Sequence, residues 1–79
     1  MDITTLINID PELLGGTPVF AGTRVPIQTL FDHLETSVPL DKFLDYFPSV
    51  SREQAVFLLK VASQLLTANN VAQLYAAVR

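Results

Sequence analysis

Apolar residues recur at positions i, i+3, i+4 and i+7 in three short segments after residue 26. Polar and charged residues occupy the opposite side of each segment. Each segment therefore predicts an amphipathic helix whose apolar stripe packs against a shared core. The three stripes are Ile27, Leu30, Phe31 and Leu34; Leu40, Phe43, Leu44 and Phe47; and Val71, Leu74, Tyr75 and Val78.

Prolines mark the limits of the first two of these helices. Pro26 and Pro39 stand where each helix begins, and the first helical turn tolerates proline because its N–H groups have no partner within the helix. Pro48 ends the second helix, since proline cannot donate the next helical hydrogen bond. The chain is therefore expected to turn at residues 48–51.

The longest helix is predicted over residues 52–66 and has the clearest start in the chain. Ser51 and Gln54 form a capping box: the serine side chain accepts from the Gln54 N–H, and the glutamine side chain reaches back to the Ser51 N–H. Apolar residues cover more than half of the circumference, so we expect this helix to be buried on most sides. Asn69-Asn70 is the expected break before the last helix, and a continuous helix through it is the alternative.

The first 26 residues differ in composition from the rest of the chain, because they hold all three glycines and three of the five prolines. A β-prone run at residues 5–9 predicts a short strand. Residues 18–20 and 23–25 flank Ala21-Gly22, which predicts a tight β-hairpin with glycine at the position of positive φ. A two-stranded ribbon is marginal by itself, so it must pack on the helices or on another subunit.

The length of the chain bounds its organisation. Seventy-nine residues leave no room for a second core, so we expect a single, mainly α-helical domain over residues 1–79. Residues 1–26 form an N-terminal strand and hairpin arm, and residues 27–79 form a bundle of three to four helices. One core of this size rarely supplies more than about 3–5 kcal/mol without a disulfide, a metal or an oligomer partner.

Composition points to a binding partner. The chain has no cysteine and one histidine, His33, so disulfides and the usual zinc sites are excluded. Of its residues, 49% are apolar and 16% are charged, and part of this apolar surplus is expected on the surface, where apolar patches mark interfaces. A homodimer is the simplest expectation.

Charge limits the kind of partner. The net charge of −3 repels a phosphate backbone and fits a basic protein better, although a local basic face could still bind DNA. The N-terminus lacks a basic stretch followed by an apolar core, and no apolar run approaches the length of a membrane span. We therefore expect a cytoplasmic protein that contacts no membrane.

The predicted helices at 40–47 and 52–66, with their turn of about four residues, match the spacing of a helix-turn-helix. In such a unit the second helix packs through one face and turns the other outward, and the N-terminal end of the outward face contacts the DNA first. Arg52 could pair with a guanine edge or a phosphate, and Lys60 and Ser63 could hold phosphates. The candidate DNA-binding residues are Arg52, Val56, Lys60 and Ser63. The alternative is an ordinary three-helix bundle, which Glu53 beside Arg52 favours.

Two further segments are candidates for a partner or dimer interface. The hairpin would act as a docking arm through Phe20 and Arg24, or Arg24 would form an intramolecular ion pair of small effect. The last helix would close the core, which is the default for such a stripe, or would lie in a groove of a partner protein. Its candidate interface residues are Val71, Leu74, Tyr75 and Val78.

The sequence offers no catalytic constellation. His33 borders an apolar stripe with no Ser, Cys or metal-ligand spacing around it and is expected to be a partly exposed helix residue. The glycines do not form a phosphate-binding loop, because no Gly-Lys-Ser/Thr follows them. Carboxylates on outward faces are most simply solubilising charges. We expect neither an enzyme nor a bound cofactor or metal.

Four stretches of the chain closely resemble a large prokaryotic family that began as a domain of unknown function and is often described as VapB-type antitoxins. The resemblance runs from about Ile9 to Leu66 and is sharpest at Gly22-Thr23-Arg24-Val25-Pro26. Two features depart from the pattern: Pro39, where such sequences more often carry a Ser or Thr-like cap, and the segment after residue 68. The matching stretches are residues 9–12, 16–27, 46–48 and 51–55.

This resemblance implies a homeodomain-like or winged-helix three-helix fold behind an N-terminal hairpin. It also implies an antitoxin that binds a PIN-like nuclease toxin, with autoregulatory DNA binding as a second activity. The family provides no catalytic residues to transfer to this chain. The alternatives are a DNA-binding regulator without a toxin partner and a purely structural dimerisation module.

Overall fold

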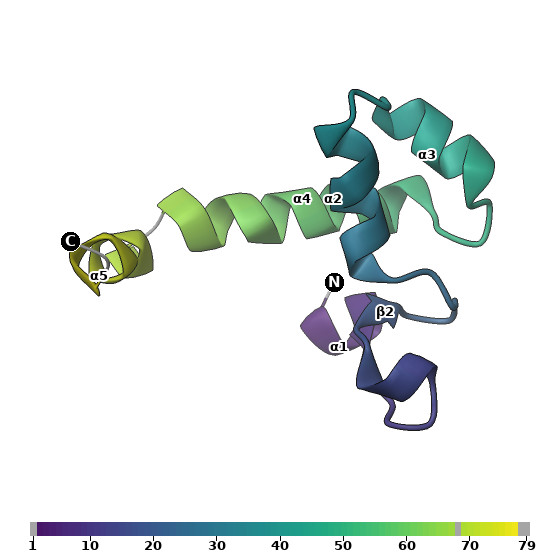
Figure 1. The fold of residues 1–79 in the computed structure, drawn as a ribbon, viewed down its shortest axis with the longest axis horizontal. Coiled ribbons are helices and arrows are strands. Elements are labelled where there is room, and N and C mark those ends of the chain that lie inside the picture. The colour runs from purple at the N-terminus through teal and green to yellow at the C-terminus, as the bar shows by residue number, and fades with distance from the viewer. Residues whose placement is uncertain (1, 68, 78–79) are drawn as a thin grey trace.

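The computed structural model describes residues 2–67 and 69–77. These residues are mainly helical and include a small antiparallel sheet (Figure 1). None of the helices they form has the length and apolar character that crossing a bilayer requires. The elements are α1 (Ile3–Leu6), β1 (Ile7–Asn8), the 3-10 turn η1 (Leu14–Gly16), β2 (Val19–Phe20), α2 (Ile27–Glu35), α3 (Leu40–Tyr46), α4 (Arg52–Thr67) and α5 (Asn69–Ala77).

The β-prone run at residues 5–9 contains the predicted short strand, but only at Ile7–Asn8, because Thr5 and Leu6 belong to α1. Asp2 caps α1, since its Oδ1 accepts from the Thr4 N–H at 2.8 Å and from Thr4 Oγ1 at 2.9 Å. These two donors lower the pKa of the Asp2 carboxyl. The cap starts a helical turn that takes up residues as far as Leu6, so that β1 keeps only Ile7–Asn8.

Strand β2 pairs with β1, and the segment that returns after the turn meets β2 only at an isolated antiparallel bridge between Val19 and Pro26. Ile7 lies opposite Phe20, and Asn8 lies opposite Val19. The chain does reverse at Ala21-Gly22 as predicted, because the Phe20 N–H donates to the Val25 carbonyl at 2.9 Å. The Thr23 side chain also bonds the backbone inside this loop, so the returning segment forms no regular strand.

The three helices after the sheet begin and end close to the predicted limits. Pro26 and Pro39 are the N-cap residues of α2 and α3, and Phe47 is the C-cap of α3. Helix α4 begins at Arg52, directly after the Ser51 of the predicted capping box. The turn chemistry of the sequence is therefore sufficient to place these boundaries.

The core gathers apolar side chains from α1, the sheet and the first half of α4, with α2 and α3 closing over them. The rings of Phe20 and Phe43 lie at its centre with their centroids 6.2 Å apart, and both side chains are fully buried. The prediction of Phe20 as an interface residue is therefore wrong, because no partner can reach it. The remaining members are Leu6, Val25, Leu30, Val50, Ala55 and Leu58.

Helix α4 is buried only along its first half, which corrects the prediction that most of its sides are covered. Leu58 is 5% exposed, whereas Leu65 and Leu66 are 57% and 62% exposed. The reason is placement: α2 and α3 lie at the N-terminal end of α4, and neither follows it toward Thr67 (Figure 1). The first half of α4 belongs to the compact part, residues 2–62, which we call the body.

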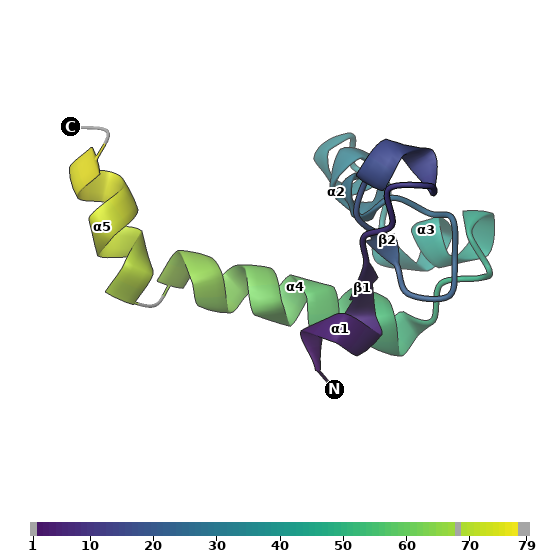
Figure 2. The ribbon, with the colours of Figure 1, turned by 90° about the horizontal axis from the view of Figure 1, so that it is seen from below.

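The end of α4 and α5 project away from the body. We call residues 63–67 and 69–77 the limb; Figures 1 and 2 show α5 lying across the far end of α4, remote from α2 and α3. Helix α5 therefore does not close the core, which corrects the default expectation, and Tyr75 is 64% exposed. The side chains of Val71, Leu74 and Val78, also predicted for this stripe, lie outside the described residues.

Candidate partner-binding surface on helix α4

Helices α3 and α4 form the bent pair that the sequence predicts. Phe47 ends α3 by donating its N–H to the Phe43 carbonyl at 3.0 Å, and the Val50 N–H donates to the Phe47 carbonyl at 3.0 Å. Val50 is 3% exposed, so the turn is anchored in the core by an apolar side chain. The turn holds the outward face of α4 clear of the body.

The N-terminus of α4 is fixed by Ser51 and Gln54. Ser51 Oγ accepts from the Gln54 N–H, and Gln54 Oε1 accepts from the Ser51 N–H, both at 3.0 Å. The same glutamine donates through Nε2 to the Ala21 carbonyl at 3.0 Å. The capping pattern predicts the first two bonds. The third joins residues 33 positions apart, and no local pattern contains it.

Arg52 forms an ion pair with Asp41 of α3. Both side chains lie at the surface, 60% and 77% exposed. The guanidinium of Arg52 is thus partly neutralised by a carboxylate of the neighbouring helix α3. A residue proposed to meet a phosphate would first have to release this partner.

A shallow hollow of about 330 Å³ lies beside Arg52 on the same outward face. The described residues that line it are Glu53, Val56, Phe57 and Lys60. Val56 is 49% exposed. The floor of the hollow is apolar, and one acidic and one basic side chain flank it.

The four predicted DNA-contact residues all lie at the surface of α4. Their side chains are exposed, as a contact surface requires. The ion pair and the hollow show that the same face also carries acidic groups. Across the outward sides of α3 and α4 the charges balance, three cations against three carboxylates: Lys42, Arg52 and Lys60, and Asp41, Asp45 and Glu53.

The turn at residues 21–24, which carries Arg24, is braced by the side chain of Thr23. Thr23 Oγ1 donates to the Phe20 carbonyl at 2.8 Å and accepts from the Val25 N–H at 3.0 Å. Gly22 has a φ of +77°, in the left-handed region that glycine adopts without strain. Arg24 is exposed, so the predicted interface residue lies on a well-braced turn.

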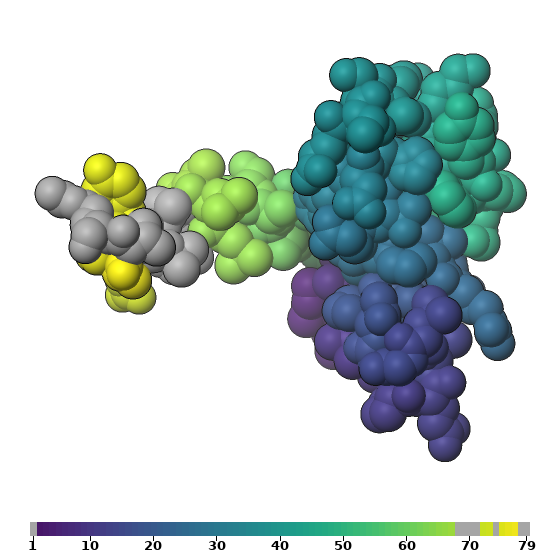
Figure 3. Space-filling model, viewed as in Figure 1, coloured from purple at the N-terminus to yellow at the C-terminus, as the bar shows by residue number. Residues whose placement is uncertain are grey.

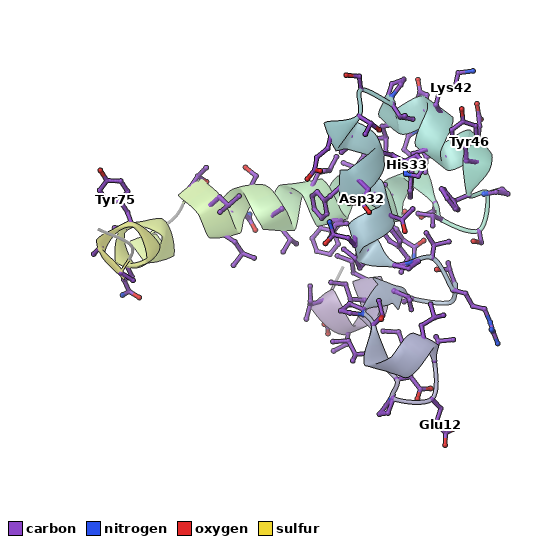
Figure 4. The ribbon with its side chains drawn as sticks, in the orientation of Figure 1. Glu12, Asp32, His33, Lys42, Tyr46 and Tyr75 are labelled. Atoms are coloured by element: carbon purple, nitrogen blue, oxygen red, sulfur yellow. The ribbon has the colours of Figure 1, made fainter. Side chains whose placement is uncertain are left out.

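His33 takes part in packing between α2 and α3. Its Nδ1 lies 2.8 Å from the Thr29 carbonyl oxygen, which can only accept, so Nδ1 carries the proton. Its ring meets Phe43 and Phe47 edge-on at centroid distances of 5.6 and 5.5 Å, and Tyr46 lies nearby (Figure 4). The position of His33 at the border of an apolar stripe predicts a partly exposed helix residue, and the side chain is half-buried. Within residues 2–67 and 69–77 no cluster of side chains suits a metal ion.

Residues 7–60 match the family described as "Protein of unknown function (DUF433)". The chain belongs to this family. It is also similar to the "Uncharacterized protein y4eO" of Sinorhizobium fredii (strain NBRC 101917 / NGR234), with 31% identity over 64 residues. The match covers 81% of this chain and 27% of that relative, so the chain spans about a quarter of its length. No solved structure matches the chain.

Proposed function

We propose that this protein is a non-enzymatic, antitoxin-like binding protein that neutralises a PIN-like nuclease toxin through the outward face of α4. One observation supports this most: the hollow on that face has an apolar centre flanked by one acidic and one basic side chain. Protein interfaces commonly have an apolar centre inside a polar rim. In this assignment Val56 and Phe57 form the centre, and Glu53 and Lys60 form the rim.

Charge favours a protein over a nucleic acid at this face. A phosphate backbone is bound by an excess of Lys and Arg, whereas Arg52 here is paired with Asp41. The chain as a whole carries a net charge of −3. Nucleases bind polyanionic substrates with basic surfaces, and an acidic protein is steered toward such a surface.

The surroundings of the ionisable groups favour binding over catalysis. No polar or charged side chain is buried among the described residues. Catalytic acids and bases need a pocket that perturbs their ionisation, and surface carboxylates lack one. Within this proposal α2, α3 and α4 form the three-helix unit of a homeodomain-like fold, with α4 as the helix that meets the partner.

Co-expression with the product of the adjacent reading frame tests this function. The two proteins should co-purify, and the complex should lack the nuclease activity of the isolated toxin. Val56→Lys should weaken the complex at least tenfold, because it places a charge in the apolar centre. Gln28→Lys, the same charge change at an exposed position of α2, is the matched control and should bind as the wild type does.

Two results would overturn the assignment. One is an adjacent frame that encodes no nuclease-like protein, together with no co-purifying partner. The other is a Val56→Lys variant that neutralises the toxin as well as the wild type. A folded circular dichroism spectrum of each variant ensures that a loss of binding is not a loss of structure.

Operator DNA is the second candidate ligand, because Arg52, Val56, Lys60 and Ser63 all lie at the surface along α4. In this alternative Arg52 leaves Asp41 and contacts a base edge or a phosphate. Affinity for the upstream DNA is measured across a salt series. A slope near zero, or equal binding by Arg52→Ala, counts against DNA binding, and a clear slope that Arg52→Ala reduces by about one supports it.

A further inference from the structure

The limb side chains whose burial is described are exposed and uncharged. Leu66 and Tyr75 are 62% and 64% exposed, and every limb side chain whose burial is described lies at the surface. Figure 3 shows the limb standing out from the body on a narrow neck, and Figure 4 shows Tyr75 directed away from the body. The limb therefore adds apolar surface to the molecule without contributing to its core.

Charge is entirely absent from this part of the sequence. Residues 61–78 contain no Asp, Glu, Lys or Arg, and twelve of these eighteen residues are apolar. Without a cation the limb cannot bind phosphates, and without basic residues on its polar side it lacks the features of a helix that lies on an anionic membrane. An uncharged, apolar helical surface fits another apolar surface.

The size of the exposed area matches one side of a dimer interface. The chain has an accessible surface of 5550 Å². A compact monomer of its mass, 8.7 kDa, is expected to expose roughly 4,700 Å². The excess is about 800 Å², which is what each partner contributes to an interface of standard size. The Cα radius of gyration of 13.9 Å likewise exceeds the roughly 12 Å expected of a compact chain.

We propose that a second copy of this chain covers the limb, so that the protein forms a two-fold dimer through residues 63–77. The bodies of two copies are both acidic and repel each other. The limb carries no charge, so two copies meet the least repulsion when they make contact through their limbs. In a two-fold dimer the limbs of the two chains pack against each other, so each limb buries the apolar surface of the other. The alanines of α5, Ala72, Ala76 and Ala77, have side chains short enough to let helices approach closely. The limb is separate from the hollow on α4 and shares only Ser63 with the candidate DNA contacts.

The test uses the purified full chain in the absence of any toxin, so its outcome does not depend on the proposed function. Sedimentation equilibrium should give twice the monomer mass of 8.7 kDa. The double variant Leu65→Glu, Leu66→Glu should raise the dissociation constant at least 100-fold. The matched control is Ile9→Glu, Tyr46→Glu, two body residues that are 64% and 60% exposed, with the same added charge. It should dimerise as the wild type does.

A second measurement stands even if the glutamate variant fails to fold. The chain has no cysteine, so Leu66→Cys and Ile9→Cys each carry a single labelling site. Pyrene on Leu66→Cys should give excimer fluorescence between chains, and pyrene on Ile9→Cys should not. A wild type that is monomeric up to about 1 mM, or a dimer lost in the body variant and retained in the limb variant, overturns the proposal.

Discussion

Leu58 and Leu65 separate the body from the limb most clearly. They lie seven residues apart on α4, about two turns, and therefore on the same face of one helix. Leu58 is 5% exposed and packs in the core, whereas Leu65 is 57% exposed. The residue type, the helix and the face are the same. What differs is how much of each side chain the surrounding elements cover, so burial is a property of the neighbours and not of the stripe.

The largest predicted effect tests this difference directly. Leu58→Ala should lower the free energy of unfolding by about 2–5 kcal/mol, because it leaves a cavity in a closed core. Leu65→Ala should change it by less than about 0.5 kcal/mol, as expected at a surface. Urea unfolding is followed at a concentration where the protein is monomeric. Equal losses in the two variants would mean that the limb packs on the body.

The turn at residues 21–24 gives the next largest effect. Gly22 has a φ of +77°, and no atom lies within 4 Å of the position a Cβ would occupy. Gly22→Ala should therefore cost about 1–2 kcal/mol through backbone strain alone. Gly22→Asn should cost less, since asparagine tolerates this region better. If alanine and asparagine cost the same, strain at this φ is not the cause.

The capping box at the start of α4 should contribute about 1 kcal/mol. Ser51→Ala removes the acceptor of the Gln54 N–H, and a lost N-cap costs about 0.5–2 kcal/mol. Ser51→Asp keeps an acceptor at this position and should restore most of the loss. Thermal unfolding by circular dichroism measures all three proteins. An alanine variant as stable as the wild type would show that the cap is dispensable.

The smallest effect is expected at the exposed ion pair. Arg52→Ala should change the free energy of unfolding by less than about 0.5 kcal/mol, because water screens both partners. Asp41→Asn should behave alike, and the double variant should show little coupling. A coupling energy above about 1 kcal/mol in this double-mutant cycle would assign the pair a structural role in joining α3 to α4.

Local chemistry made the helix limits and the α4 cap predictable, as Pro26, Pro39 and Ser51 illustrate. The same reasoning missed that β1 pairs with β2 and that Phe20 is buried. Both depend on where β1 lies, which a pattern within the loop cannot contain. The outward residues of α4 could be named from the helical wheel. The pairing of Arg52 with Asp41 could not, because it spans two helices.

The sequence by itself determined where the chain turns and which side of each helix is apolar, since prolines, glycines, caps and periodicity act over a few residues. Only the tertiary structure decided which apolar sides are covered. Helices α2 and α3 lie only at the N-terminal end of α4, so the same stripe that is core at Leu58 becomes surface at Leu65. That placement leaves the limb exposed.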